Sequence, residues 1–200
     1  MTDATAKCPR VNDIDRARAR EYALLASLLT RSPDAGLLAR LATVRGDASP
    51  IGMAHLSLAE AAVRATEASV AREFSALFAG LGEGALLPYA SHYLTGTLYG
   101  RPLARLRATL RGLGIETSPT RFEPEDHAGF LCEVMAALAG GRISSSEDAQ
   151  RGFFDRHFAP WMRCFFADLE HAEAADFYAA VGVIGRTLIE IETTAFALPD

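Results

Sequence analysis

The residues whose types point most directly to chemistry form one acid-rich stretch in the second half of the chain. It reads Glu123-Pro124-Glu125-Asp126-His127, so that three carboxylates and an imidazole stand directly before a long apolar run. Proline suits the first turn of a helix, and carboxylates are favourable near a helix N-terminus. We therefore expect Pro124 in the first helical turn and Glu123 at or near the N-cap.

The density of charge in this stretch exceeds what a helix start requires. Three acids within four residues repel one another and need a cation, water or a partner nearby. A ligand with a guanidinium group would meet that need, because carboxylates accept its N–H groups in pairs. The competing interpretation is a well-formed helix start with a structural role only. In that case His127 is a structural histidine, and Glu123, one helical turn before it, lies on the same face of the helix.

A second candidate stretch interleaves aromatic, polar and proline residues over positions 86–94. It contains Pro88, Tyr89, Ser91 and Tyr93, and it is typical of a loop leading into a helix. Such loops run over the protein surface, where aromatic rings are available to a ligand. The competing interpretation is that Tyr89 and Tyr93 cover the core.

The sequence lacks the patterns of a catalytic or metal site. Helical di-metal proteins use paired Glu-x-x-His motifs, whereas this chain offers a single Asp168-x-x-His171. Zinc spacing is missing, and the glycines at 80–84 have no preceding strand or following Gly-Lys-Ser/Thr, as a phosphate loop requires. On a helix, Glu125 to His127 would fan out by about 100° per residue rather than converge on one ion. We expect a binding protein with no bound cofactor or metal, rather than an enzyme.

Composition narrows the class of partner and compartment. The 200 residues, 50% of them hydrophobic, suffice for one domain or two small ones. A net charge of −5 argues against general binding of nucleic acid or anionic membranes, and the arginines at 16, 18 and 20 are expected on a solvated helix face. No run approaches the ~18 apolar residues of a membrane span, and the first residues lack a secretory signal. A cytoplasmic protein without stable membrane insertion is predicted.

The three cysteines agree with a reducing compartment. Cys8, Cys132 and Cys164 are widely spaced and show no pairing pattern. Cys132 and Cys164 fall inside apolar patterns, so we expect both in the core.

Helical periodicity supplies the elements that must position these residues. No stretch shows sustained period-two alternation, so the fold class is all-α, a helical bundle. We expect helices over about 15–29 and 35–41, from Ser57 with an interruption before Glu73, from Pro102, from the acidic stretch to Gly140, after Ser144–Ser146, from Pro160, and from about Glu173 to Phe196. Residues 115–122, rich in Thr, Ser and Pro, are the best hinge candidate. They would join an N-terminal helical part, 1–114, to a C-terminal part, 123–200.

Five short segments carry a resemblance to a known family. They are Glu73–Gly80, Pro88–Tyr93, Glu123–His127, His157–Trp161 and Phe177–Tyr178. In order and spacing the chain, from about Phe74 onwards, resembles the TorD/DmsD/NarJ family of redox-enzyme maturation chaperones, whose best-known mark is the acidic stretch. Pro160 and Trp161 match the family's C-terminal mark but suit the core equally well, and we expect them there.

The resemblance implies a cytoplasmic, non-enzymatic chaperone with two helical parts joined by a hinge and forming one family domain. It implies binding of the twin-arginine signal peptide of a molybdenum-cofactor oxidoreductase subunit, which delays export until cofactor insertion and folding are complete. The apo form of that catalytic subunit is a further candidate partner. The family resemblance implies a monomer or homodimer, occasionally domain-swapped. Weak guanine-nucleotide binding is associated with some members, although this chain has no nucleotide motif.

The resemblance also turns the two candidate stretches into one hypothesis of binding. The arginines of the leader would pair with the carboxylates, while its apolar h-region would lie in a groove lined by the tyrosines. Burial of large apolar side chains contributes about 1.5–3 kcal/mol each and exposed ion pairs roughly 0–1, so the h-region would supply most of the affinity. Asp126 and His127 carry most weight by family resemblance, with Pro124 shaping the turn. The full set is Glu123, Pro124, Glu125, Asp126, His127, Pro88, Tyr89, Ser91 and Tyr93.

Two rival interpretations remain open. The first is a helical hydrolase that uses Asp126 and His127, for which the sequence supplies no nucleophile. The second is a helical adaptor that binds a folded partner through its aromatic surface and ignores leader peptides.

Overall fold

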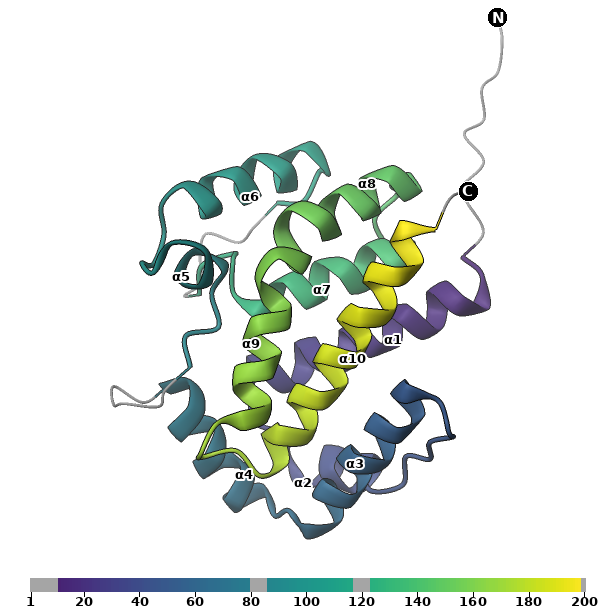
Figure 1. Cartoon of the computed structure of the whole chain (residues 1–200), viewed down its shortest axis with the longest axis vertical. Helices are drawn as coiled ribbons and strands as arrows, with labels where there is room; N and C mark the ends of the chain where they lie inside the picture. Colours follow the sequence, from purple (N-terminus) through teal and green to yellow (C-terminus); the bar gives the residue numbers. More distant parts are fainter. Residues whose placement is uncertain (1–10, 80–85, 117–122, 199–200) are drawn as a thin grey trace, which may run out of the picture.

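The computed structural model describes residues 11–79, 86–116 and 123–198, and the regular elements within these ranges are all helices (Figure 1). The all-α prediction is confirmed. The helices are α1 (Asp13–Thr30), α2 (Ala35–Leu41), α3 (Pro50–Arg64), α4 (Glu67–Phe74), α5 (Ala90–Thr95), α6 (Arg101–Gly112), α7 (Ala128–Ala139), α8 (Glu147–Phe153), α9 (Ala159–His171) and α10 (Phe177–Ala197). Two π-helical turns, Ser75–Ala79 and Phe154–Phe158, extend α4 and join α8 to α9.

Capping side chains explain where several helices begin, and they correct one expectation. The hydroxyl of Ser49 accepts a hydrogen bond from the backbone N–H of Gly52, and Pro50 follows in the first turn. Helix α3 therefore begins at Pro50, and the prediction of a start at Ser57 was wrong. Ser57 lies inside the helix, where its hydroxyl donates to the carbonyl of Met53. The expected interruption before Glu73 is present, because α3 ends at Arg64 and α4 begins at Glu67.

A distant carboxylate sets the start of the last helix. The side chain of Glu73 on α4 accepts hydrogen bonds from the backbone N–H groups of Asp176, Phe177 and Tyr178, at 2.6–3.2 Å. These N–H groups would otherwise lack partners at a helix N-terminus. Helix α10 consequently begins at Phe177, rather than near Glu173 as the sequence pattern suggested.

One continuous core joins both halves of the sequence. Helix α7 packs along α1, and α9 packs along α10, which also contacts α3 (Figure 1). The approach of α9 and α10 depends on a small residue, because a Cβ at Gly185 would lie 2.2 Å from the ring of Phe166. The largest of the fully buried side chains include Trp161, Tyr22 and Tyr178. Trp161 is thus in the core, as expected, whereas Pro160 is exposed.

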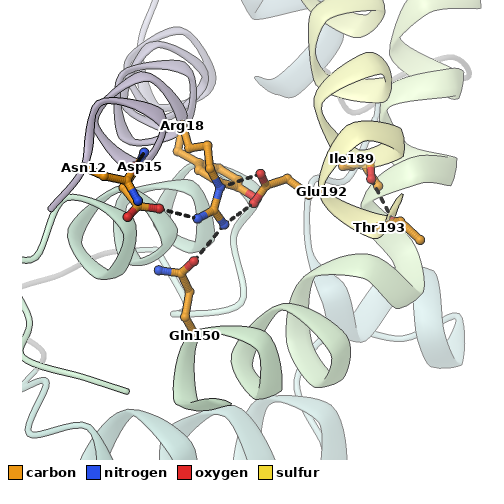
Figure 2. Close-up of polar contacts among 8 residues, drawn as sticks. Asn12, Asp15, Arg18, Gln150, Ile189, Glu192 and Thr193 are labelled. Atoms are coloured by element: carbon orange, nitrogen blue, oxygen red, sulfur yellow. Dashed lines mark hydrogen bonds and ion pairs between the residues drawn. The ribbon is translucent and has the colours of Figure 1, made fainter. Parts of the chain in front are cut away.

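An arginine expected in solvent instead forms a buried junction between α1, α8 and α10. The guanidinium of Arg18 donates to both carboxylate oxygens of Glu192 at 2.6–2.7 Å, to Gln150 at 2.7 Å and to Asp15 at 2.9 Å (Figure 2). The hydroxyl of Tyr22 donates a third hydrogen bond to Glu192, which is fully buried. The prediction of a solvated face is confirmed for Arg16 and Arg20 and is wrong for Arg18, because the partner of Arg18, Glu192, is 174 residues away in sequence.

The remaining expectations about the fold have mixed outcomes. Cys132 is buried as expected, but Cys164 is exposed, because α9 turns the neighbouring residues Phe165 and Phe166 inward. Cys8 and most of the hinge candidate, residues 117–122, lie outside the described residues, so the division into two parts stays a prediction. Within the described ranges, no helix combines the length and apolar character needed to cross a bilayer.

Candidate functional site

The structure brings the two candidate stretches together in a short antiparallel bridge between Tyr89 and His127. The backbone N–H of Ala90 donates to the carbonyl of Asp126 at 3.0 Å. In return, the N–H of Ala128 donates to the carbonyl of Pro88 at 2.7 Å. The starts of α5 and α7 are therefore joined through their backbones, toward the end of the molecule that also holds α6 and α8 (Figure 1).

The acid-rich stretch precedes the helix instead of forming its first turn. His127 is the N-cap of α7, in an extended conformation, and its Nδ1 accepts a hydrogen bond from the N–H of Gly129 at 3.1 Å. The expectation that Pro124 lies in the first helical turn, with Glu123 as the N-cap, was wrong. A helical face shared by Glu123 and His127 is excluded for the same reason: Glu125 and Asp126 lie in a turn ahead of the helix, and His127 is extended and paired with Tyr89. Pro124 instead shapes the turn, its carbonyl accepting from the N–H of His127 at 3.2 Å.

Asp126 is buried and links the acid-rich stretch to the start of α5. Only 1% of it is exposed, and its Oδ2 accepts a hydrogen bond from the N–H of Ser91 at 2.8 Å. Helix α5 has no side-chain cap from its own N-cap residue, Tyr89, so Asp126 supplies one from outside. The other carboxylate oxygen, Oδ1, is buried without a hydrogen-bond partner among the described atoms. Ser91 is also buried, and its hydroxyl accepts from the N–H of Tyr99 at 3.0 Å.

The chain itself supplies a cation for the second carboxylate. Arg107 on α6 donates to Oε2 of Glu125 through Nε at 2.9 Å and lies within 2.8 Å of it through a second guanidinium nitrogen. This hydrogen-bonded pairing raises the pKa of Arg107. Part of the positive charge that the sequence seemed to require from a ligand is therefore intramolecular.

Glu123 is the carboxylate of the stretch that remains exposed. It accepts a hydrogen bond from the hydroxyl of Tyr89. Burial, followed by this contact with Glu123, raises the pKa of Tyr89 well above its usual value, so the phenol stays a donor. The ring of Tyr89 also meets the ring of His127 edge-on, with centroids 5.3 Å apart. Tyr89 thus links the exposed acid to the bridge.

Tyr93 faces the core more than the solvent. Its ring packs against Trp161 and Phe165, with centroids 5.4 and 5.9 Å away, and its hydroxyl donates to Asp168 at 2.9 Å. The ring of His171, in the single Asp-x-x-His match, bonds instead to the carbonyl of Ala167 in its own helix. In the described ranges, no group of three or more His, Cys, Asp or Glu side chains is placed to hold a metal ion.

Exposed apolar side chains gather beside this junction. Of the nine large hydrophobic residues that are exposed in the described ranges, four fall between positions 87 and 99: Leu87, Leu94, Leu98 and Tyr99. We call these four residues the α5 apolar surface. Sequence reasoning missed Leu98 and Tyr99. The available signal was the pair of glycines at 96 and 100, which have positive φ and shape the connection from α5 to α6.

A cavity of about 600 Å³ lies between α5, α6 and the π-helical turn Phe154–Phe158. Its lining combines apolar side chains with arginines and hydroxyl groups: Ala90, Leu94, Thr95, Arg101, Pro102, Arg105, Leu106, Ala108, Thr109, Arg156 and His157. Nε2 of His157 lies 2.8 Å from the hydroxyl of Thr109. Burial, with a smaller effect of Arg156, lowers the pKa of His157 to about 4. No sequence pattern pointed to this cavity, because Thr109 and His157, which meet in its lining, are 48 residues apart along the chain.

Two other segments of the resemblance serve the fold rather than the bridge. Glu73 caps α10, as described above, and the rings of Phe74 and Phe78 pack against Tyr178, with centroids 5.9 and 5.4 Å away. The segments Glu73–Gly80 and Phe177–Tyr178 therefore meet through their described residues.

The sequence is similar to a protein-family model and to proteins from several bacteria. A family model described as nitrate reductase delta subunit matches residues 45–167, beginning well ahead of Phe74. The chaperone protein TorD of Vibrio cholerae is 28% identical over 130 residues, which cover 60% of this chain and 59% of that protein. The probable Tat proofreading chaperone DmsD of Haemophilus influenzae is 30% identical over 118 residues, 58% of this chain and 56% of its own.

A longer match extends over nearly the whole chain. The chaperone protein TorD of Shewanella loihica is 23% identical over 200 residues, covering 90% of this chain and 93% of that protein. In the Vibrio and Haemophilus comparisons, the chain spans only a little over half the length of the relative. All three relatives bear the names of chaperones, in line with the expectation of a protein that is not an enzyme.

Proposed function

The chain belongs to the nitrate reductase delta subunit family, as its resemblance to maturation chaperones indicated, and we propose that it binds the twin-arginine signal peptide of a molybdenum-cofactor oxidoreductase subunit. By holding the leader in the cytoplasm, it delays export until cofactor insertion and folding are complete. The names of its relatives support this proposal, since one of them is a probable Tat proofreading chaperone. The apo catalytic subunit is the second proposed partner.

The observation that carries the proposal is the pairing of an exposed acid with an exposed apolar surface. Glu123 is held by Tyr89 directly beside the segment that carries Leu87, Leu98 and Tyr99. A twin-arginine leader has a basic n-region followed at once by an apolar h-region. The arrangement therefore complements such a leader, because it offers a negative charge to the n-region and an apolar surface to the h-region.

The structure suggests different tasks for the residues that the sequence grouped together. Glu123 is exposed and suits direct contact with an arginine of the leader, whereas Asp126 and Ser91 are buried and suit positioning of the loop. Glu125 has a guanidinium partner already, Arg107, so it offers a site where an incoming arginine competes with an internal one. His127 acts through the cap of α7 and its contact with Tyr89.

Affinity and specificity then come from different parts of the surface. Burying each large side chain of the α5 apolar surface against the h-region contributes about 1.5–3 kcal/mol. An exposed ion pair at Glu123 contributes about 0–1 kcal/mol. The h-region consequently supplies most of the binding free energy, and the acid fixes where the n-region lies.

Titration calorimetry tests the proposal with leader peptides from molybdoenzymes, each paired with a twin-lysine version. We expect saturable binding of at least one leader, weakened by the lysine exchange. Leu98→Asp should weaken binding by more than about tenfold, because it places a charge under the h-region, and Glu123→Gln by about two- to fivefold. Glu173→Gln, at an exposed acid elsewhere, is the matched control. Equal affinity for the arginine and lysine versions would rule out the proposed role of the acid.

A second binding experiment separates the proposal from the adaptor interpretation. A client subunit with its leader deleted should bind much more weakly than the full-length client. Undiminished binding of the leaderless client would contradict leader recognition and favour an adaptor for a folded partner.

A further inference from the structure

The cavity beside α5 has apolar walls and a positively charged rim. Ala90 and Leu94 of α5 form one apolar wall, and Pro102 and Leu106 of α6 form the other. Its volume of about 600 Å³ lies within the range of roughly 300–1,000 Å³ that small-molecule sites occupy. The hollow is therefore large enough for a ligand with an apolar body.

Three guanidinium groups line this cavity without carboxylate partners. Arg101 and Arg105 come from α6 and Arg156 from the π-helical turn, and none of them forms an ion pair within the described ranges. No acidic residue is among the lining residues. The chain has a net charge of −5, whereas the lining of this cavity has a positive net charge. The potential at the cavity mouth thus favours anions.

The neighbours of these arginines show that the arrangement is specific to the cavity. Arg107, on the same helix, turns away from the cavity and pairs with Glu125. Thr109 and His157 also line the cavity but add no charge, because the ring of His157 is neutral and its Nε2 lies 2.8 Å from the Thr109 hydroxyl. A bound anion would therefore find its charged partners at the rim and an apolar surface below.

We propose that this cavity binds a small organic anion, with its apolar body between α5 and α6 and its carboxylate, sulfonate or phosphate group on Arg101, Arg105 and Arg156. The cavity suits such a molecule better than a leader peptide. The three arginines repel a basic n-region, and an h-region carries no charge to pair with them. The cavity shares only Leu94 with the α5 apolar surface, and its three arginines take no part in the proposed leader binding.

Paired fluorescent probes test the charge requirement. Anilinonaphthalene sulfonate carries an apolar body and one negative charge, whereas N-phenylnaphthylamine has a similar body without the charge. We expect the sulfonate to bind the wild-type protein at least about threefold more tightly than the neutral probe. Raising the salt concentration from about 0.05 to about 0.5 M should weaken only the charged probe, because salt screens exposed charges.

Arginine variants then locate the site. Arg105→Gln and Arg156→Gln should each raise the dissociation constant of the sulfonate by about three- to fivefold and leave that of the neutral probe unchanged. Arg111→Gln changes an exposed arginine on α6 that does not line the cavity, so it is the matched control. Circular dichroism and the thermal midpoint of each variant verify that the fold is retained. Competition by naphthyl phosphate and by naphthoate distinguishes a preference for phosphate from one for carboxylate.

Three results would overturn the proposal. One is equal affinity for the charged and the neutral probe, and another is the absence of sulfonate binding. The third is an unchanged sulfonate affinity in both Arg105→Gln and Arg156→Gln, which would assign the probe to another apolar surface.

Discussion

Arg18 and Arg105 lie in two regions of the molecule that differ in whether the chain supplies an ion-pair partner for an arginine side chain. At the junction of α1, α8 and α10, the guanidinium of Arg18 is held by Glu192, Gln150 and Asp15 (Figure 2). In the α5–α6 region, Arg105 lines a cavity and has no ion-pair partner within the described ranges. A charged group that stabilises the fold has its partners within the chain, whereas a charged group without an ion-pair partner is available to bind a ligand.

The same contrast separates the carboxylates. Glu73 uses both oxygens to accept three backbone N–H groups, and Glu192 is fully surrounded by donors. Asp126, although buried, satisfies Oδ2 and leaves Oδ1 without a partner among the described atoms. The α5–α6 region therefore combines an unsatisfied buried oxygen, unpaired arginines and exposed apolar side chains. We infer that stability is concentrated at the α1–α10 side and binding at the α5–α6 side.

The largest expected effect comes from breaking the Arg18 junction. Arg18→Leu leaves the fully buried carboxylate of Glu192 without its cation, which should lower the free energy of unfolding by about 3–5 kcal/mol. Chemical denaturation measures this change. The double variant Arg18→Leu with Glu192→Leu should recover part of the loss, because no buried charge remains, although the buried hydroxyl of Tyr22 loses its acceptor. Arg20→Leu, at an exposed arginine of the same helix, should change stability by less than about 0.5 kcal/mol. A loss equal to that of this control would contradict the buried junction.

Removing the cap of α10 should have the next largest effect. Glu73→Ala leaves three backbone N–H groups at the N-terminus of α10 without their acceptor, so we expect a loss of about 1–3 kcal/mol. Thermal or chemical denaturation provides the measurement. Glu60→Ala, at an exposed acid of α3, is the control, and equal losses from the two substitutions would contradict the capping role of Glu73.

In the α5–α6 region, loss of the hydrogen bond between Asp126 and the N–H of Ser91 should have a local effect. Asp126→Ala removes the cap of α5, which should cost about 1–2 kcal/mol and reduce the hydrogen-exchange protection of residues 90–95 more than that of α10. Asp126→Asn keeps an acceptor for the N–H of Ser91 and should retain most of that protection. Uniform loss of protection across the chain would show that the two regions are not separable.

The smallest expected effect is a pH dependence at the cavity. The folded protein keeps His157 neutral with a pKa lowered to about 4, whereas the unfolded chain protonates it near pH 6.5. The unfolded state therefore takes up more protons as the pH falls. The contribution of His157 is complete above about pH 6.5 and is lost as the pH falls toward 4. Denaturation of wild type and His157→Gln at pH 7 and pH 5.5 should show their stability difference shrinking by about 1 kcal/mol. A difference that is independent of pH would contradict a buried neutral ring.

Local signals predicted the fold class and most helices, and failed where a partner is distant in sequence. Periodicity and caps are properties of neighbouring residues, so the all-helical reading and the helix after Ser146 could be obtained from the sequence. The start of α10 could not, since it depends on Glu73, about a hundred residues earlier. The prediction for Arg18 was wrong for the same reason, because no residue near Arg18 in sequence indicates its pairing with Glu192.

The candidate site was found in its composition and misjudged in its geometry. Both stretches that meet in the bridge were identified, one from its density of carboxylates and the other from its interleaved aromatic, polar and proline residues. Their roles were not, since the cap that Asp126 supplies to α5 and the pairing of Glu125 with Arg107 are tertiary contacts. The cavity escaped prediction entirely, because its lining comes from three elements whose mutual placement the sequence does not encode locally.

The bridge between Tyr89 and His127 has a consequence for how the chain tolerates changes in length. Its two backbone hydrogen bonds fix the first residues of α5 and α7 against each other. An inserted residue at position 127 would shift this register and rotate α7 by about 100°, turning its buried face away from α1. An insertion between Gly96 and Gly100 leaves both hydrogen bonds in place. Variation in length among related chains should therefore accumulate in the α5–α6 connection, while the spacing across the two paired segments stays constant.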